Sequence, residues 1–126
     1  MLKDKDVIAT VSVKDLARAR KFYEGTLGLT VTNAEGAEAL TFKSGNASLI
    51  VYRSEYAGTN KATALNWNVG DELEKTVAAL KERGVTYEHY DLPGMTRTGD
   101  VHTAMGRFKS AWFKDPDGNI IALMGS

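Results

Sequence analysis

The segment Trp112-Phe113-Lys114-Asp115-Pro116-Asp117-Gly118-Asn119-Ile120 decides the fold that we expect for this chain. Its centre, residues 115–119, consists of Asp, Pro, Gly and Asn, the residue types that favour a tight turn. Apolar residues on both sides predict strands at 108–114 and 120–124. The chain is therefore expected to end in a β-hairpin, from which the preceding elements can be interpreted.

Two stretches of the chain share one order of elements: a strand, a helix and three further strands. When the sequence is aligned with itself so that these two stretches overlap, Asp15 falls opposite Asp71. Gly28 then aligns with Gly84. Asp15 is expected to cap the first helix, and Asp71 with Glu74 to form a capping box on the second. The expected strands are 7–13, 29–32, 39–42, 47–52, 64–69, 85–90, 108–114 and 120–124.

This order predicts an α+β fold built from two β-α-β-β-β modules within a single domain, 1–126. Module one covers about 1–57 and module two about 64–126, with a polar linker between them. A chain of 126 residues is long enough to bury a core of its own.

Composition excludes several classes of function. The chain has no cysteine, which excludes disulfides, thiol catalysis and Cys-ligated metals. Its 16 basic and 16 acidic residues balance, so nucleic acid and anionic membranes are not expected partners. No apolar run is long enough to span a bilayer, and no secretory signal is visible, so a cytoplasmic location is expected.

Two motifs carry a resemblance to a known family. The first is Val13-Lys14-Asp15-Leu16 followed by Phe22-Tyr23 and Leu27-Gly28-Leu29, and the second is the terminal segment 112–120. With the repeat, they make the chain resemble the vicinal oxygen chelate superfamily, which includes glyoxalase I, extradiol dioxygenases, fosfomycin-resistance enzymes and bleomycin-resistance proteins. The resemblance implies a curled, cup-like mixed sheet with helices outside, a ligand inside, and a homodimer.

The resemblance also implies four strand positions that hold a metal ion in metal-using members. In this sequence they are occupied by Ile8, Ile50, Ala64 and Ala122. These side chains have no lone pair to offer a divalent cation, which needs oxygen or nitrogen donors. We therefore expect no metal and no cofactor.

Alternation of side chains along each strand predicts which residues line the cup. Trp67 has the opposite parity and is expected to pack against the helices. Asn66 and Asn68 are unusual in a strand and have two open interpretations, hydrogen bonding to nearby backbone or orienting a ligand. The predicted ligand-binding residues are Thr10, Ser12, Ser48, Tyr52, Asn66, Asn68, Arg107 and Met124. Such a lining favours an uncharged or aromatic small molecule.

The segment Asp91–Arg107 is expected to be a long irregular loop that gates the cup, with Gly94 and Gly106 at its ends. It carries Asp100 and His102, whose spacing suggests a carboxylate that orients an imidazole as a general base. Tyr90, just before the loop, is a further weak catalytic candidate.

Three functions remain open. The first is a metal-free protein that binds a small molecule. The second is a metal-independent enzyme, of the lyase or isomerase type, that uses loop residues around His102. The third is a dimeric interaction module whose cup is filled by its own side chains. An open pocket would favour the first two.

Overall fold

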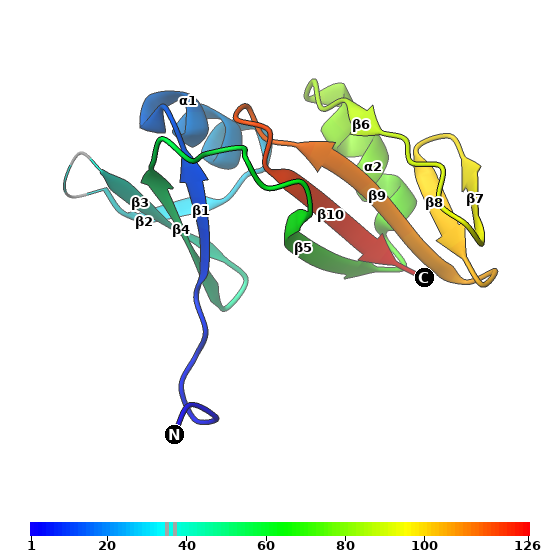
Figure 1. Ribbon diagram of the computed structural model, residues 1–126, viewed down its shortest axis with the longest axis horizontal. Helices are drawn as coiled ribbons and strands as arrows, with labels where there is room; N and C mark the ends of the chain where they lie inside the picture. The colour runs from blue at the N-terminus through cyan, green and yellow to red at the C-terminus, as the bar shows by residue number, and fades with distance from the viewer. Residues whose placement is uncertain (35, 37) are drawn as a thin grey trace. The chain divides into compact units, whose positions relative to one another are not determined.

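The chain divides into two compact units, Met1–Thr59 and Asn60–Ser126. The computed structural model of the protein describes residues 1–34, 36 and 38–126. Each unit has one mixed sheet with helical residues packed on one face, so the predicted α+β class is confirmed (Figure 1). The description of 1–126 as a single domain stays a prediction. Within the described residues, no helix is both long and apolar enough to cross a membrane.

The first unit contains a four-stranded sheet in the order β1-β4-β3-β2. β1 and β4 are parallel, and the other pairs are antiparallel. The helical stretch after β1 begins as α1 and continues without a break as a π-helix, η1. The elements are β1 (Ala9–Val13), α1 (Leu16–Arg20), η1 (Lys21–Thr26), β2 (Thr30–Asn33), β3 (Ala39–Ser44) and β4 (Ala47–Arg53).

Asp15 caps α1 as predicted, because its Oδ1 accepts the N–H of Arg18 at 3.1 Å. The helical residues then bury Tyr23 against Phe42 of β3, with ring centroids 5.8 Å apart. On β1 and β4 the alternate side chains Val11, Val13, Leu49 and Val51 are also buried. One face of this sheet therefore forms the core with the helix, and the other face is open.

The second unit contains a sheet in the order β5-β10-β9-β8-β7, with β6 also paired to β9. Its single helix, α2, packs against β5, β9 and β10. The elements are β5 (Thr63–Gly70), α2 (Leu73–Glu82), β6 (Tyr87–Glu88), β7 (Met95–Thr98), β8 (Val101–Ala104), β9 (Phe108–Lys114) and β10 (Ile120–Gly125).

The core of the second unit lies between α2 and the strands. Tyr87 packs edge-on against Phe113 at 5.8 Å between ring centroids, and its hydroxyl donates to the Val77 carbonyl at 3.0 Å. Burial raises the pKa of the Tyr87 phenol. Near the end of β10, Gly125 packs closely against Gly70 and Leu73. The position requires glycine, because a Cβ there would collide with the Gly70 carbonyl oxygen and with the side chain of Leu73.

The terminal hairpin forms as predicted, and a buried carboxylate explains its turn. Oδ1 of Asp115 accepts the backbone N–H groups of Asp117 and Asn119, both at 2.9 Å. Its Oδ2 accepts the side-chain amide of Asn119 at 2.8 Å. Asp115 and Asn119 are both buried, so these bonds replace the water that the turn would otherwise need.

The prediction of a long irregular loop at 91–107 is wrong. Most of it forms the hairpin β7–β8, which extends the sheet beside β9. Thr98 pairs with Val101, so Gly99 and Asp100 form a two-residue turn in which Gly99 has a φ of 61°. Thr98 and Val101 flank Gly99-Asp100, a pattern that favours a β-hairpin. The segment was nevertheless predicted to be a loop because of its length.

Other differences are smaller. The capping box predicted on α2 is absent, since the N-cap is Glu72 and has no side-chain cap bond. The carboxylate of Glu74 instead binds Lys109 Nζ at 2.9 Å, a contact that lowers the pKa of Glu74. β1 starts at Ala9 rather than at residue 7, and β6 is shorter than the strand expected at 85–90.

Candidate functional site

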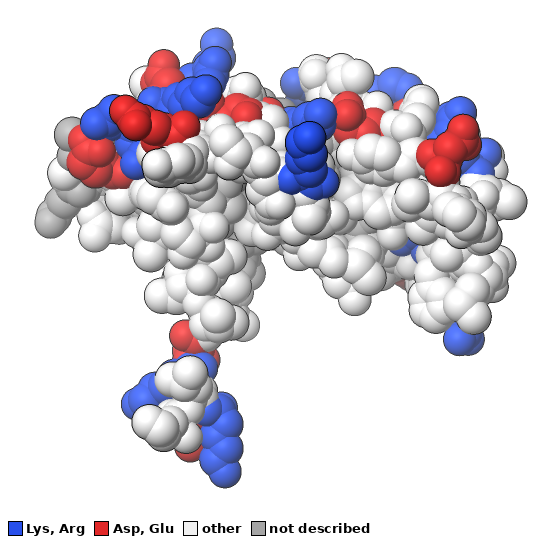
Figure 2. Space-filling model, in the orientation of Figure 1, with Lys and Arg blue, Asp and Glu red and all other residues white. Residues whose placement is uncertain are grey.

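The open face of the first sheet carries the side chains that alternation predicted. Thr10, Ser48 and Tyr52 are exposed, and Ser12 is half-buried. Their neighbours of opposite parity, such as Leu49, lie in the core. On the face of this unit that Figure 2 shows, charged side chains gather over α1 and the N-terminal segment, with uncharged side chains over the strands between.

On the open face of the second unit, the strand register aligns five candidate binding residues side by side in one row across the sheet. Some of them were predicted from the sequence and the others were not. Asn68 of β5 is paired with Met124 of β10, which is paired with Ser110 of β9. Ser110 is paired with His102 of β8, which is paired with Arg97 of β7. The row therefore contains an amide, a thioether, a hydroxyl, an imidazole and a guanidinium across five strands.

A second row runs beside the first and places an indole on the same face. Asn66 is paired with Ala122, and Ala122 with Trp112. Trp67 lies on the opposite side of the sheet and is paired with the buried Leu123, which agrees with its predicted direction. The first row depends on the pairing of β8 with β9, which the sequence alone does not provide, whereas the second row needs only β5, β10 and β9.

Three rings form an aromatic cluster on this face, which we define as Tyr90, His102 and Trp112. Ring centroids lie 4.9 Å apart for His102 and Trp112, 5.3 Å for Tyr90 and Trp112, and 6.1 Å for Tyr90 and His102. The Trp112 indole N–H donates to Thr63 Oγ1 at 3.3 Å. His102 is fully buried, whereas Tyr90 and Trp112 keep part of their surface exposed.

His102 is held as a neutral imidazole. The Tyr90 backbone N–H donates to Nε2 of His102 at 2.9 Å, so Nε2 is unprotonated and the proton lies on Nδ1. Burial lowers the pKa of His102. Burial also raises the pKa of the Tyr90 phenol. With its Nε2 lone pair already engaged, His102 is poorly arranged to accept a proton from a substrate.

The expected Asp100–His102 pair does not form. Asp100 Oδ1 accepts from His89 Nε2 at 2.8 Å, and its Oδ2 accepts from Lys81 Nζ at 3.1 Å. The His89 hydrogen bond, with Lys81 beside it, holds the pKa of Asp100 below its usual value. The reason is the two-residue turn, which places Asp100 at the end of the hairpin while His102 lies within β8.

The remaining predicted residues have local partners. Asn68 Oδ1 accepts the Gly70 backbone N–H at 3.0 Å, which agrees with the backbone interpretation of this residue. Asn66 Nδ2 contacts Met124 Sδ. Arg107 lies in the β8–β9 turn, with its guanidinium carbon 4.7 Å from the centre of the Phe108 ring. Whether these side chains bind a ligand stays a prediction.

The four positions inferred for metal ligands do not fit a metal ion. Ile8 and Ala64 are exposed, Ile50 is half-buried and Ala122 is buried. None of the four has a donor atom in its side chain. In the part of the chain that the structure describes, no three His, Asp or Glu side chains gather where they could hold a metal.

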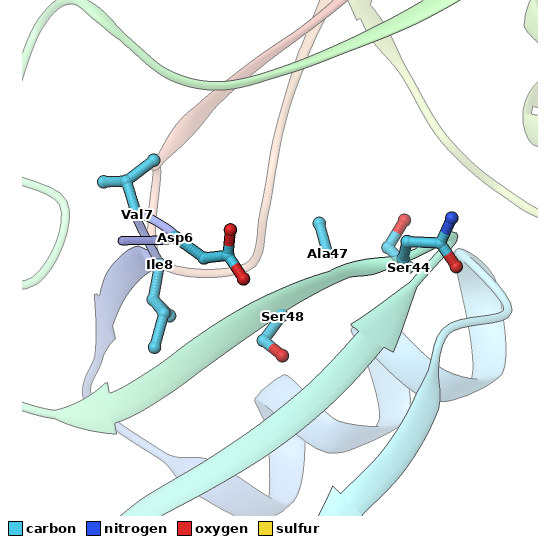
Figure 3. Close-up of a pocket in the computed structure, with 7 residues that line it drawn as sticks. Asp6, Val7, Ile8, Ser44, Ala47 and Ser48 are labelled. Carbon is cyan, nitrogen blue, oxygen red and sulfur yellow. The ribbon is translucent and has the colours of Figure 1, made fainter. Parts of the chain in front are cut away.

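A groove of about 600 Å³ lies in the first unit, beside the start of β1 and the β3–β4 turn (Figure 3). It includes Ser48, which was predicted, together with Asp6 and Asn46, which were not. The full lining is Asp6, Val7, Ile8, Ser44, Asn46, Ala47 and Ser48. A smaller hollow of about 290 Å³ is lined by Lys14, Arg53, Ser54 and Glu55.

Comparison with known proteins agrees with the resemblance. Residues 7–123 match the model of a family described as the Glyoxalase/Bleomycin resistance protein/Dioxygenase superfamily. No curated protein matches the chain.

Similar solved structures include the genomically encoded fosfomycin resistance protein FosX from Listeria monocytogenes, with 15% identity, a TM-score of 0.75, and coverage of 99% of this chain and 93% of that one. A lactoylglutathione lyase from Agrobacterium tumefaciens has 15% identity, a TM-score of 0.74, and coverage of 97% and 94%. A glyoxalase family protein from Enterococcus faecalis has 21% identity, a TM-score of 0.74, and coverage of 98% and 99%. At these identities the likeness concerns the fold.

Proposed function

The chain belongs to the Glyoxalase/Bleomycin resistance protein/Dioxygenase superfamily, and from this premise we propose that it is a metal-free protein that binds a small molecule. One observation carries the proposal. Ile8, Ile50, Ala64 and Ala122 occupy the positions that the resemblance implies for metal ligands, and their side chains have no donor atoms. Chemistry that depends on chelating a substrate at a metal ion has no support in these residues.

The open face of the second unit supports an aromatic or uncharged ligand. Tyr90 and Trp112 lie edge to face, and their part-exposed surfaces offer apolar contact to a flat molecule. Asn66 and Ser110 lie in the adjoining rows and add hydrogen-bonding groups. Arg97 is the charged member of the first row, and its Nη1 donates to the Gly99 carbonyl at 2.7 Å. Apolar surface with a few polar groups is the usual composition of a small-molecule site.

The enzyme alternative is weaker because its base is poorly placed. His102 is buried and accepts a backbone hydrogen bond, so it is not arranged as the general base that this alternative needs. The imidazole that does have an orienting carboxylate is His89, bound to Asp100. The His89 ring lies outside the aromatic cluster, with its centroid 6.5 Å from that of His102, and its Nε2 is bound to Asp100. A binding role therefore accounts for more of the observations than a catalytic one.

We also propose that the protein forms a homodimer in the cytoplasm, without nucleic-acid or membrane partners. The dimer is supported by the family, and by the edge strands β2 and β7, which expose backbone groups that a partner could cover. The proposal that nucleic acid and membranes are not partners is supported by the balance of charges. Sedimentation at micromolar concentration tests the dimer, and a mass equal to one chain would exclude it.

Elemental analysis tests the metal-free proposal. Protein purified without chelator is expected to hold no stoichiometric divalent metal, and native mass spectrometry of the same sample would reveal a co-purified small molecule. One zinc, nickel, manganese or iron ion per chain, removed by chelator with loss of ligand binding, would overturn the proposal.

An uncharged fluorescent probe, N-phenyl-1-naphthylamine, tests the proposed face. Tyr90→Ala should weaken probe binding by about three- to tenfold, because an aromatic contact is lost. Tyr90→Phe should bind normally, and so should Tyr56→Ala, an exposed tyrosine of the first unit. Equal affinity of Tyr90→Ala and the native protein would exclude this face as the site.

A further inference from the structure

The groove of the first unit exists because the parallel ladder between β1 and β4 ends early. Its register begins with Ala9 beside Leu49. On β4, Ala47 and Ser48 continue to pair with β3. The chain before Ala9, residues 6–8, lies beside this end of β4 outside the β1 ladder, and the space between them is the groove of about 600 Å³. That volume is in the range of ligand sites.

The charge and polarity of the groove are specific. Asp6 is the single ionisable side chain in its described lining, which includes no Lys or Arg. Figure 3 shows the Asp6 carboxylate pointing across the groove toward Ala47, with Ser44 beyond it. The lining also supplies hydroxyl and amide oxygens from Ser44, Ser48 and Asn46. These groups can all accept hydrogen bonds from a donor.

The apolar part of the lining is formed by Val7, Ile8 and Ala47. Val7 is 94% exposed and Ile8 is 48% exposed, so both offer hydrocarbon surface. A bare metal ion is a poor occupant, because it needs several charged or carbonyl oxygens and would leave this surface in water. An anion is also a poor occupant, because the carboxylate would repel it.

We propose that this groove is a second binding site, for a small organic cation with an apolar body, such as an arylalkylammonium ion. The ammonium group pairs with Asp6 and donates to the serine hydroxyls. The hydrocarbon body contacts Val7, Ile8 and Ala47. The groove belongs to the first unit, and its proposed ligand differs in charge from the one proposed for the aromatic cluster of the second unit.

Titration with benzylammonium, followed by the backbone amide NMR signals, tests the proposal. Benzyl alcohol serves as the uncharged ligand of matched shape. Benzylammonium at millimolar concentration should shift the signals of Ser44, Asn46, Ala47 and Ser48. Asp6→Asn should weaken its binding by about two- to fivefold, the range expected for an exposed ion pair. Asp4→Asn removes a nearby charge that does not line the groove and should leave the affinity unchanged.

Added salt should weaken benzylammonium binding to the native protein more than to Asp6→Asn, since mobile ions screen an exposed pair. Benzyl alcohol should bind both proteins equally. Equal benzylammonium affinity of Asp6→Asn and the native protein would overturn the proposal. So would equal weakening by Asp4→Asn, signal shifts confined to the second unit, or an absence of shifts. None of these outcomes affects the test of Tyr90, which uses a different ligand and face.

Discussion

Replacement of His102 should remove a pH dependence from the stability of the second unit. His102 is fully buried, its Nε2 accepts the Tyr90 N–H, and burial lowers its pKa. A histidine whose pKa is lower in the folded state contributes stability that is fully present above its unfolded pKa. That stability is lost as pH falls toward the folded pKa, because the unfolded chain binds the proton first.

The magnitude follows from this linkage. An unfolded histidine titrates near pH 6.5, so if the folded imidazole stays neutral, the free energy of unfolding falls by at most about 1.9 kcal/mol between pH 7 and pH 5. His102→Gln should remove this slope, because the Gln side-chain oxygen can replace Nε2 as acceptor and does not titrate. His102→Phe should also remove the slope and should cost a further ~1–3 kcal/mol at neutral pH, since the Tyr90 N–H loses its acceptor.

Urea unfolding followed by tryptophan fluorescence measures both effects. The two tryptophans of the chain, Trp67 and Trp112, belong to the second unit, so the signal reports on it. Asp100, whose pKa is lowered, loses its contribution only as pH falls below the usual range of aspartate, about 4, and stays outside this window. His89→Gln is the matched control for the other histidine. If His102→Gln keeps the native slope, the assignment of the pH dependence to His102 is refuted.

Three further substitutions test the fold and the open face. Asp115→Ala should destabilise the protein by about 2–4 kcal/mol in urea unfolding, since three hydrogen bonds to its carboxylate are lost, among them the one from the buried Asn119 side chain; a loss under about 1 kcal/mol would show that water replaces them. Gly125→Ala should cost about 1–3 kcal/mol because its Cβ meets the Gly70 carbonyl, and an unchanged thermal midpoint would contradict that contact. Asn68→Leu should lower stability by about 0.5–1.5 kcal/mol through the lost bond to the Gly70 N–H and leave the affinity for N-phenyl-1-naphthylamine unchanged, whereas the reverse pair of results would assign Asn68 to the ligand.

Local signals predicted the fold well where neighbours in sequence are also neighbours in space. The turn at Asp115 and the cap at Asp15 are satisfied within four residues, so their residue types were sufficient. The capping box at Asp71 failed for the opposite reason. Glu74 has a partner 35 residues away, Lys109 on β9, and that contact competes with a local cap. Sequence pattern does not report such a competitor.

The candidate site shows the same division. Alternation placed Asn66, Asn68 and Met124 on one face, because period-two direction is a local property of a strand. The aromatic cluster could not be found in this way. Trp112 and His102 come together only through the pairing of β8 with β9, and β8 lies in the segment that the sequence pattern predicted to be irregular. A missed turn at Gly99 therefore concealed both the cluster and the partner of Asp100.

Ala122 connects the missing metal ligand to the aromatic cluster. It is buried, and the β9–β10 register places it directly beside Trp112 on the same face. Directly opposed residues on a sheet have Cβ atoms about 5 Å apart, so a large indole is best accommodated by a small neighbour. A carboxylate at position 122 would lie against the indole and would be partly desolvated without a cation. The alanine thus supplies no donor atom at a position that the resemblance implies for a metal ligand, and it leaves space for the ring. The apolar and aromatic character of this surface is what supports the proposal that it binds an uncharged or aromatic ligand.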